Sequence, residues 1–475
     1  MNTRMLTPAT TVDAHGNVAT GDATAVALYD AALDRLLRFH PDVIELSGRL
    51  VSEHAECAMG HALAAYLGLM STEPGDAEAA RASASTLRAG PATPRERAHL
   101  AAIDAWSSGD WHGAARVLDQ LLVQWPTDVL AMIFGHQLDF FVGDAHNLRD
   151  RVGRSLLAFD PSHPHVGFVK GMHAFGLEES GHYQAAEASG QAALDAHPDD
   201  VWAVHAIVHA YEMQGRVDDG IRFLTERERD WGSGNLFTVH NWWHFGLFQL
   251  EAGRPGTALE IYDREIHHAQ SAGIALEMLD ASAMLWRLML DGIDTGARFA
   301  SLADAWANWS DGAPWYVFND LHATMAFVGA GRMDEARQLV ARSTEVAQHP
   351  STASDSNRWM TESVGLPACR AVLAFSEERY DDVLNELTPI RATFNRFGGS
   401  HAQRDVLQRT IVEAAIRSGN SLLARALLRE RLSMRGSSVY SWSRYAQTLR
   451  DVGDQTGAAT AEQHATMWRE RFAAV

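Results

Sequence analysis

Regularly spaced glycines constrain the fold of this chain more than any other feature. Each of nine glycines ends one helical pattern and precedes the next: Gly109, Gly143, Gly181, Gly215, Gly253, Gly292, Gly331, Gly419 and Gly453. The spacings are 34, 38, 34, 38, 39, 39, 88 and 34 residues, and we expect the gap of 88 to hide another boundary near Glu378. Between the glycines, apolar residues recur three and four positions apart, which predicts amphipathic helices. The pattern therefore predicts an all-α chain of short helical repeats with little or no sheet.

The clearest repeat unit runs from Gly181 to Pro198, with the sequence GHYQAAEASGQAALDAHP. Its glycine permits a tight turn, and its proline ends the second helix. The stretch from Gly109 to Pro126 repeats this scheme. A period near 34 residues with paired helices resembles the tetratricopeptide repeat. The resemblance implies a right-handed superhelix of helical hairpins around a central concave groove or pocket.

Three segments are expected along the chain. We predict a flexible leader over residues 1–21, an N-terminal helical cap over 22–90, and a tetratricopeptide-like repeat solenoid over 91–475. A solenoid needs a cap because its end repeat has a neighbour on one side only.

Composition excludes several classes of partner. The chain has 40 Lys and Arg against 60 Asp and Glu, a net charge of −20, so we expect no nucleic-acid partner and no membrane surface. Cys57 and Cys369 form no CxxC pattern, which favours a reducing compartment. The N-terminus lacks the apolar core of a signal peptide, and no run approaches eighteen apolar residues. We therefore expect a soluble cytoplasmic protein; the sequence does not indicate its oligomeric state.

Two histidine motifs fall on neighbouring repeats. His205, His209 and Glu212 lie four and three residues apart, on one helical face, and His240 and His244 lie four apart. In tetratricopeptide folds the second, fifth, ninth, twelfth and thirteenth positions face inward when the turn glycine is counted as the fifteenth. The first three residues occupy positions five, nine and twelve, and the next repeat places its histidines at two and six. All but His244, at the edge, are predicted to face the groove.

The chemistry of these residues suits a metal ion. Imidazole and carboxylate groups bind zinc, iron or manganese, and a catalytic zinc ion keeps three such ligands and one open position. We predict that His205, His209 and Glu212 hold a divalent metal and that a metal-bound water, with a pKa near 7, is available for chemistry. His240 and His244 would be further ligands, partners of the ligands or acid–base groups. Ala206 follows His205, so the HExxH protease motif is absent.

Two alternatives to a metal site stay open. Histidines with pKa values near 6.5 would also serve acid–base chemistry in a metal-free pocket. A groove that binds a peptide without any chemistry is the other alternative, because the concave surfaces of helical repeats commonly bind partners.

Further polar residues on predicted inner helices complete the candidate site. Arg404 joins His240 and His244 as a candidate catalytic residue. The candidate substrate-binding residues are His136, His173, Arg287, Asp320 and Gln403. Either arginine would hold an anionic group with its two-pronged guanidinium, or would pair with Asp280 or Asp405 instead.

Several stretches together resemble the tetratricopeptide repeat protein 38 family. They are VHAIVHAYEMQGR at 204–216, VHNWWHFGLFQLEAGRPGTALEIYD at 239–263, the segment from Asp320 to His322, and GGSHAQRD at 398–405. The resemblance implies an all-α repeat fold and an intracellular protein, and it implies no established reaction. It emphasises the same histidine motifs.

These observations lead to one main hypothesis and one alternative. The main hypothesis is an enzyme, a metal-dependent hydrolase or lyase, acting on a small polar molecule in a His/Glu-rich central pocket. The alternative is a non-catalytic scaffold whose groove binds a peptide or a protein partner.

Overall fold

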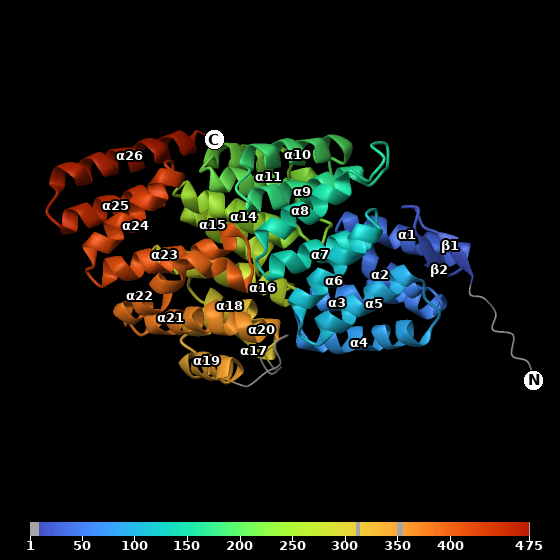
Figure 1. Cartoon of the computed structure of the whole chain (residues 1–475). Helices are drawn as coiled ribbons and strands as arrows, with labels where there is room; N and C mark the ends of the chain where they lie inside the picture. Colours follow the sequence, from blue (N-terminus) through green and yellow to red (C-terminus); the bar gives the residue numbers. More distant parts are fainter. Residues whose placement is uncertain (1–8, 310–313, 349–354, 475) are drawn as a thin grey trace, which may run out of the picture.

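The chain folds into stacked antiparallel helical hairpins, and the expected all-α superhelix is confirmed (Figure 1). The computed structural model describes residues 9–309, 314–348 and 355–474. One end of the molecule contains α1 (Ala23–Leu37), α2 (Asp42–Glu53), α3 (Ala58–Met70), α4 (Pro74–Ala89), α5 (Pro94–Ser107) and α6 (Trp111–Gln124).

The middle of the chain supplies the repeats that carry the histidine motifs. These are α7 (Val129–Phe141), α8 (Ala145–Leu156), α9 (Val166–Glu179), α10 (Tyr183–Ala196), α11 (Val201–Met213), α12 (Val217–Glu226), α13 (Glu228–Trp231), α14 (Thr238–Glu251), α15 (Pro255–Ile261) and the π-helix η1 (Tyr262–Ile266).

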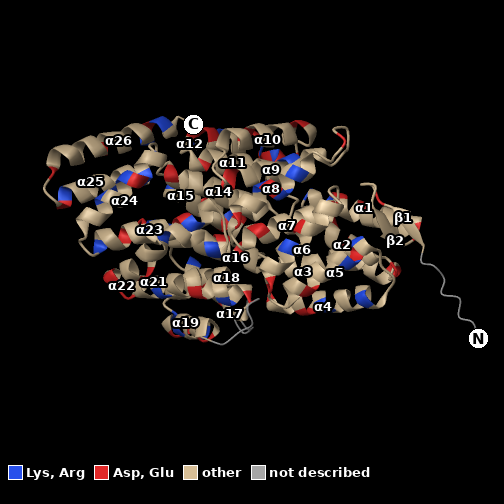
Figure 2. Cartoon of the chain, viewed as in Figure 1, with Lys and Arg blue, Asp and Glu red and all other residues tan. Residues whose placement is uncertain are grey.

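The remaining elements extend to the opposite end, where α24–α26 lie (Figure 1). They are α16 (Ala275–Leu290), α17 (Arg298–Trp309), α18 (Val317–Gly329), α19 (Met333–Gln348), α20 (Ser356–Met360), the π-helix η2 (Thr361–Gly365), α21 (Leu366–Ser376), α22 (Tyr380–Leu387), the 3₁₀-helix η3 (Thr388–Phe397), α23 (His401–Arg417), α24 (Ser421–Met434), α25 (Val439–Asp451) and α26 (Gln455–Ala473). None of the described helices is both long and apolar enough to span a membrane. Figure 2 shows acidic and basic residues interspersed along most helices.

The turns between helices follow the predicted boundaries. All nine repeat glycines have positive φ, for example +80° at Gly181, a conformation that other residues rarely adopt. The boundary expected in the long gap lies at Glu378, which has a φ of 57° and follows the end of α21. This confirms the hidden repeat boundary, where a glutamate takes the conformation that glycine adopts elsewhere.

A small β-hairpin departs from the expected loose leader. Strands β1 (Thr10–Val12) and β2 (Val18–Thr20) pair antiparallel; residues 1–8 of the leader lie outside the described residues. The Thr20 N–H and hydroxyl both donate to the Glu96 carboxylate at 2.7 Å, and Arg95 pairs with Asp13 at 3.1 Å. The sequence predicted a flexible leader because the hairpin is held by contacts with residues about 80 positions further along the chain.

The segment around η3 and the start of α23 lies across the inside of the superhelix. The Tyr316 hydroxyl beside it donates to the carbonyl of Phe141 at 3.1 Å. The Arg404 guanidinium pairs with Glu179 at 3.0 Å, and Arg287 donates to the carbonyl of Ala402 at 2.7 Å. These contacts join α23 to α9 and α16, and join α7 to Tyr316 at the start of α18, around the hollow.

We expect Gly398→Ala to destabilise the protein by about 2–4 kcal/mol, because a side chain there is both strained and overpacked. Gly398 has a φ of 87°, and an added Cβ would overlap the Tyr316 hydroxyl and the Phe141 carbonyl oxygen. Gly453→Ala is the matched control: its φ is 82° and nothing lies within 4 Å of an added Cβ. Thermal unfolding of both variants measures the difference. Equal losses would show that the crowding at Gly398 does not matter.

Candidate metal centre

Four histidines from two adjacent repeats meet inside the protein. His205 and His209 come from α11, and His240 and His244 come from α14. Each offers one ring nitrogen, and these nitrogens all lie within 4.8 Å of one another. His209 and His244 are fully buried, and the His240 side chain is 15% exposed. We call this group the four-histidine cluster.

The separations within the cluster match those of ligands around one ion. His240 Nε2 lies 3.2 Å from His205 Nε2 and 3.3 Å from His244 Nε2. Zinc binds imidazole nitrogen at about 2.0–2.1 Å, so two tetrahedral ligands lie roughly 3.3–3.4 Å apart. The observed spacing therefore leaves room for one metal ion among the rings.

Carboxylates behind the rings determine which nitrogen faces the centre. Asp280 Oδ2 lies 2.7 Å from His240 Nδ1, and Glu212 Oε2 lies 3.1 Å from His244 Nδ1. A carboxylate accepts a hydrogen bond from Nδ1–H, which leaves a lone pair on Nε2 of a neutral ring. Nε2 of His240 and His244 thus face each other with lone pairs. Facing lone pairs repel, so the arrangement requires a proton or a cation between them.

Burial sets the charge of the cluster. It lowers the pKa of His205 and of His244 well below the ordinary value, with the neighbouring histidines acting in the same direction. Both rings are therefore neutral at pH 7 and able to bind a metal. Burial also lowers the pKa of His209, but the carboxylates of Glu178 and its neighbours outweigh this and raise it overall. Burial raises the pKa of Glu212 to about 7.

The structure groups the predicted metal-binding residues differently from the prediction. His205 and His209 lie in the cluster as expected, whereas Glu212 lies behind His244 as its hydrogen-bond partner. His244, expected at the edge of the groove, is fully buried at the centre. The geometry therefore favours four histidines over the predicted set of two histidines and Glu212.

The two arginines predicted to bind an anionic ligand instead bond with other groups of this chain. Arg404 pairs with Glu179 and donates to the Gly399 carbonyl, and Arg287 donates to the carbonyls of Ala283 and Ala402. Neither lines the cavity described below. Their predicted pairing with Asp280 or Asp405 is also not observed, because Asp280 contacts His240 and Asp405 pairs with Arg431.

The other predicted substrate-binding residues are dispersed. Only Gln403 lines the central cavity, where its Oε1 accepts the Ser400 N–H at 3.0 Å. His136 lies at the wall of a smaller chamber, 3.2 Å from the Leu148 carbonyl. His173 contacts α8 near Gly153. Asp320 is buried in α18, and burial raises its pKa to about 7.

A cavity of about 290 Å³ lies beside the cluster. His205 and His240 form part of its wall, so the centre is accessible from this side. The elements that line it come from most of the chain: α1, α2, α3, α7, α11, α14, α16, α18 and the start of α23. Its lining includes Ile44, Leu236 and Ile274, which are 58%, 49% and 44% exposed, so they form an apolar opening to solvent.

Glu178 is a site residue that the sequence reasoning missed. It is fully buried, and its Oε2 lies 3.4 Å from His209 Nδ1. The repeat frame could have identified it. Glu178 occupies the twelfth position of its repeat when Gly181 is counted as the fifteenth, and Glu212 occupies the same position relative to Gly215. Asp280 lacked such a signal: its role depends on how α16 packs against α14.

Together the hairpins, turn residues and enclosed inner surface define a tetratricopeptide-like helical-repeat protein. No protein-family model matches the chain. Similar solved structures include the human IFIT1 dimer with PPP-AAAA, at 12% identity and a TM-score of 0.40 over 94% of this chain and 95% of that chain. The Cut9–Hcn1 hetero-tetramer of APC/C matches at 11% identity and 0.28, over 94% and 93%. The P58(IPK) TPR domain matches at 10% and 0.22, over 80% and 96%.

Proposed function

We propose that this protein holds a divalent transition-metal ion at the four-histidine cluster and uses it to bind a small molecule in the adjoining cavity. The observation that carries the proposal is the pair of facing Nε2 atoms of His240 and His244, each ring oriented by its own carboxylate. Carboxylate–histidine–metal arrangements orient ligands in this way in metalloproteins. Imidazole ligands favour zinc or iron over the harder manganese ion.

The enclosed geometry supports a small-molecule ligand over a peptide at the centre. Three of the four histidines are less than 3% exposed, and only His205 and His240 of the cluster line the cavity. A ligand atom would approach the metal from the cavity side, where Lewis-acid activation of a carbonyl or of water would operate. The predicted hydrolase or lyase activity rests on this opening and stays part of the proposal.

A scaffold that binds a peptide or protein partner is the second candidate. The repeat architecture itself supports it, because such arrays commonly present binding surfaces. The exposed apolar residues Ile44, Leu236 and Ile274 offer a contact surface that does not require the histidines. The resemblance to the tetratricopeptide repeat protein 38 family, which rests on the four stretches of sequence given above, is compatible with either candidate.

The direct test is metal content. Untagged protein is treated with EDTA, reconstituted with Zn²⁺ or Fe²⁺, and analysed by mass spectrometry of the bound metal. We expect about one equivalent per chain, since the cluster has room for one ion. No bound metal after reconstitution would contradict the proposal and favour the scaffold.

Asp280→Asn is expected to weaken zinc binding by about 10–100-fold, because an amide orients the His240 ring less well than a carboxylate does. Asp263→Asn serves as the control, since Asp263 is an exposed partner of Arg298. Competition with a chromophoric chelator measures both dissociation constants. Equal affinities in the two variants would show that Asp280 does not orient the metal ligand.

A further inference from the structure

The cavity beside the four-histidine cluster is largely apolar and rich in aromatic rings. Seven aromatic side chains line it: Phe39, Phe140, Phe141, Trp202, Phe237, Tyr316 and Phe318. The aromatic lining implies that the body of the ligand is apolar, because these side chains provide large apolar contact area. A neutral ring face also attracts a cation, with the strongest attraction where water is excluded.

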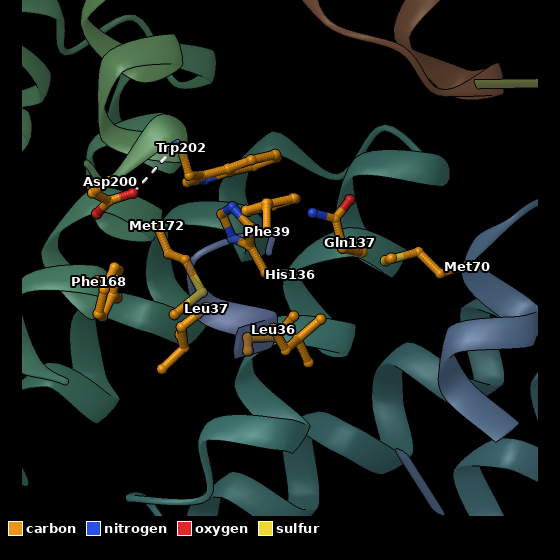
Figure 3. Close-up of a pocket in the computed structure, with 11 residues that line it drawn as sticks. Leu36, Leu37, Phe39, Met70, His136, Gln137, Phe168, Met172, Asp200 and Trp202 are labelled. Carbon is orange, nitrogen blue, oxygen red and sulfur yellow. Dashed lines mark hydrogen bonds between the residues drawn. The ribbon is translucent and has the colours of Figure 1, made fainter. Parts of the chain in front are cut away.

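A smaller chamber adjoins this cavity (Figure 3). The two share Leu36, Phe39, Met70, Gln137 and Trp202 as lining residues. The chamber has a volume of about 20 Å³, which is room for about one water molecule. Methionine and leucine side chains form much of its wall, so it can adapt to the end of an apolar ligand.

The charged groups of the wall are all acidic. Among the described residues that line the two cavities, none is lysine or arginine, and the carboxylates are Glu277 and Asp200. Asp200 is buried at the start of α11, where its Oδ1 accepts the N–H groups of Trp202 and Ala203. Glu277 differs: within the described part of the chain its carboxylate has no hydrogen bond and no ion pair.

The environment of Glu277 favours a positive partner. Burial raises its pKa, and the nearby carboxylate of Asp280 acts in the same direction. His268 acts oppositely but lies beyond ion-pair distance. A cation against Glu277 would offset both the burial and the repulsion between the carboxylates. An anionic ligand would meet these two carboxylates with no basic residue in the described wall to balance them.

We propose that the cavity binds a largely apolar molecule that carries one basic amine, with its ammonium group against Glu277 and its apolar body among the aromatic rings. This inference deepens the proposed function, because it names the ligand class of the same cavity, but it does not require the metal. Glu277 lies one helical turn before Asp280, whose carboxylate contacts His240, so the ammonium group would lie near the metal site without using any of its ligands.

Calorimetric titration with three probes of matched shape tests this inference: 4-phenylbutylamine, 4-phenylbutan-1-ol and 4-phenylbutyrate. Titrations use EDTA-treated and zinc-loaded protein at pH 8, where the amine is protonated. The amine is expected to bind roughly tenfold or more tightly than either other probe, because its hydrogen bond to a carboxylate is charge-assisted. In Glu277→Gln this preference over the alcohol should disappear while the alcohol binds as before. Glu265→Gln, at the half-buried partner of the exposed Arg264, should retain it.

Binding of the butyrate or the alcohol as tightly as the amine would overturn the inference, and so would a failure of all three probes to bind. Retention of the amine preference in Glu277→Gln would overturn it as well. The alcohol titration shows whether a variant still folds around its cavity. Metal content of the same samples separates the two proposals: losing the amine preference leaves the metal in place, whereas losing the metal leaves the amine preference in place.

Discussion

Replacing both His205 and His209 by alanine is expected to abolish metal binding. The double substitution removes two of the four nitrogens that converge in the cluster and leaves a space in place of both rings. We expect about one equivalent of zinc in the unaltered protein and none in the variant. Two remaining imidazoles are too few for a stable zinc site, which takes three or four protein ligands.

Thermal unfolding gives the same experiment a second readout. A metal that binds only the folded state stabilises it by about 2.7 kcal/mol when the free metal is 100 times its dissociation constant. EDTA should therefore lower the unfolding midpoint of the unaltered protein and leave the double variant unchanged. This comparison remains informative even if the variant is less stable, because each protein is its own reference.

The matched control is His267→Ala with His268→Ala. This substitution also removes two histidines, but they lie after η1, outside the four-histidine cluster, and the His267 ring contacts Ser301 and Tyr262. The control should retain one equivalent of zinc. If both double variants retain the same metal content, the four-histidine cluster is not the metal site.

Arg95→Ala is expected to destabilise the N-terminal part of the protein by about 3–5 kcal/mol, because it leaves buried carboxylates without their counter-charge. Arg95 pairs with Asp13 at 3.1 Å and with Asp128 at 3.0 Å, and all three side chains are at most 2% exposed. His99 also contacts Asp128, at 2.9 Å. One guanidinium therefore connects the β-hairpin, α5 and the start of α7.

Hydrogen–deuterium exchange locates the loss and urea unfolding measures its size. Faster exchange should begin in the hairpin at 10–20 and in α5. Arg88→Ala is the control, because Arg88 and Asp104 form an exposed pair that contributes about 1 kcal/mol at most. Similar exchange in both variants would mean that the buried pairs do not hold the hairpin.

Lowering the pH should weaken the same buried ion pairs that Arg95→Ala removes. Burial alone would raise the pKa of Asp128, but His99 and Arg95 together hold it well below its usual 3.8. A carboxyl group whose pKa is lowered by folding stabilises the native state above its ordinary pKa and loses this contribution as the pH falls towards the folded value. The unaltered protein should therefore lose more stability than Arg95→Ala when the pH falls below about 4.

Much of the fold was predictable because repeat spacing and helical periodicity are local properties. The turns between helices require a residue with positive φ, which is usually glycine. The boundary at Glu378, which has no glycine, could still be located from the repeat period of about 34–39 residues. The same frame placed His205, His209 and His240 on inner faces. Glu178 was within reach of it, since it repeats the position of Glu212.

The repeat frame does not predict how helices from different repeats pack against one another. Glu212 was predicted as a ligand because it shares a helical face with His209, but the depth of α14 against α11 decides that His244 occupies the centre and Glu212 lies behind it. Arg404 looked free to bind an anion, yet Glu179, 225 residues away, pairs with it.

The sequence by itself determined the helices, their turns and the inward direction of the histidines, because these depend on residues within about one repeat. Only the tertiary structure decided the order of the N-terminal hairpin, the contacts of α23 with α9 and α16, and the position of Glu277, which has no partner among the described residues, in the wall of an aromatic cavity. Each depends on contacts between distant parts of the chain, and side-chain packing at such contacts is not encoded in any local spacing.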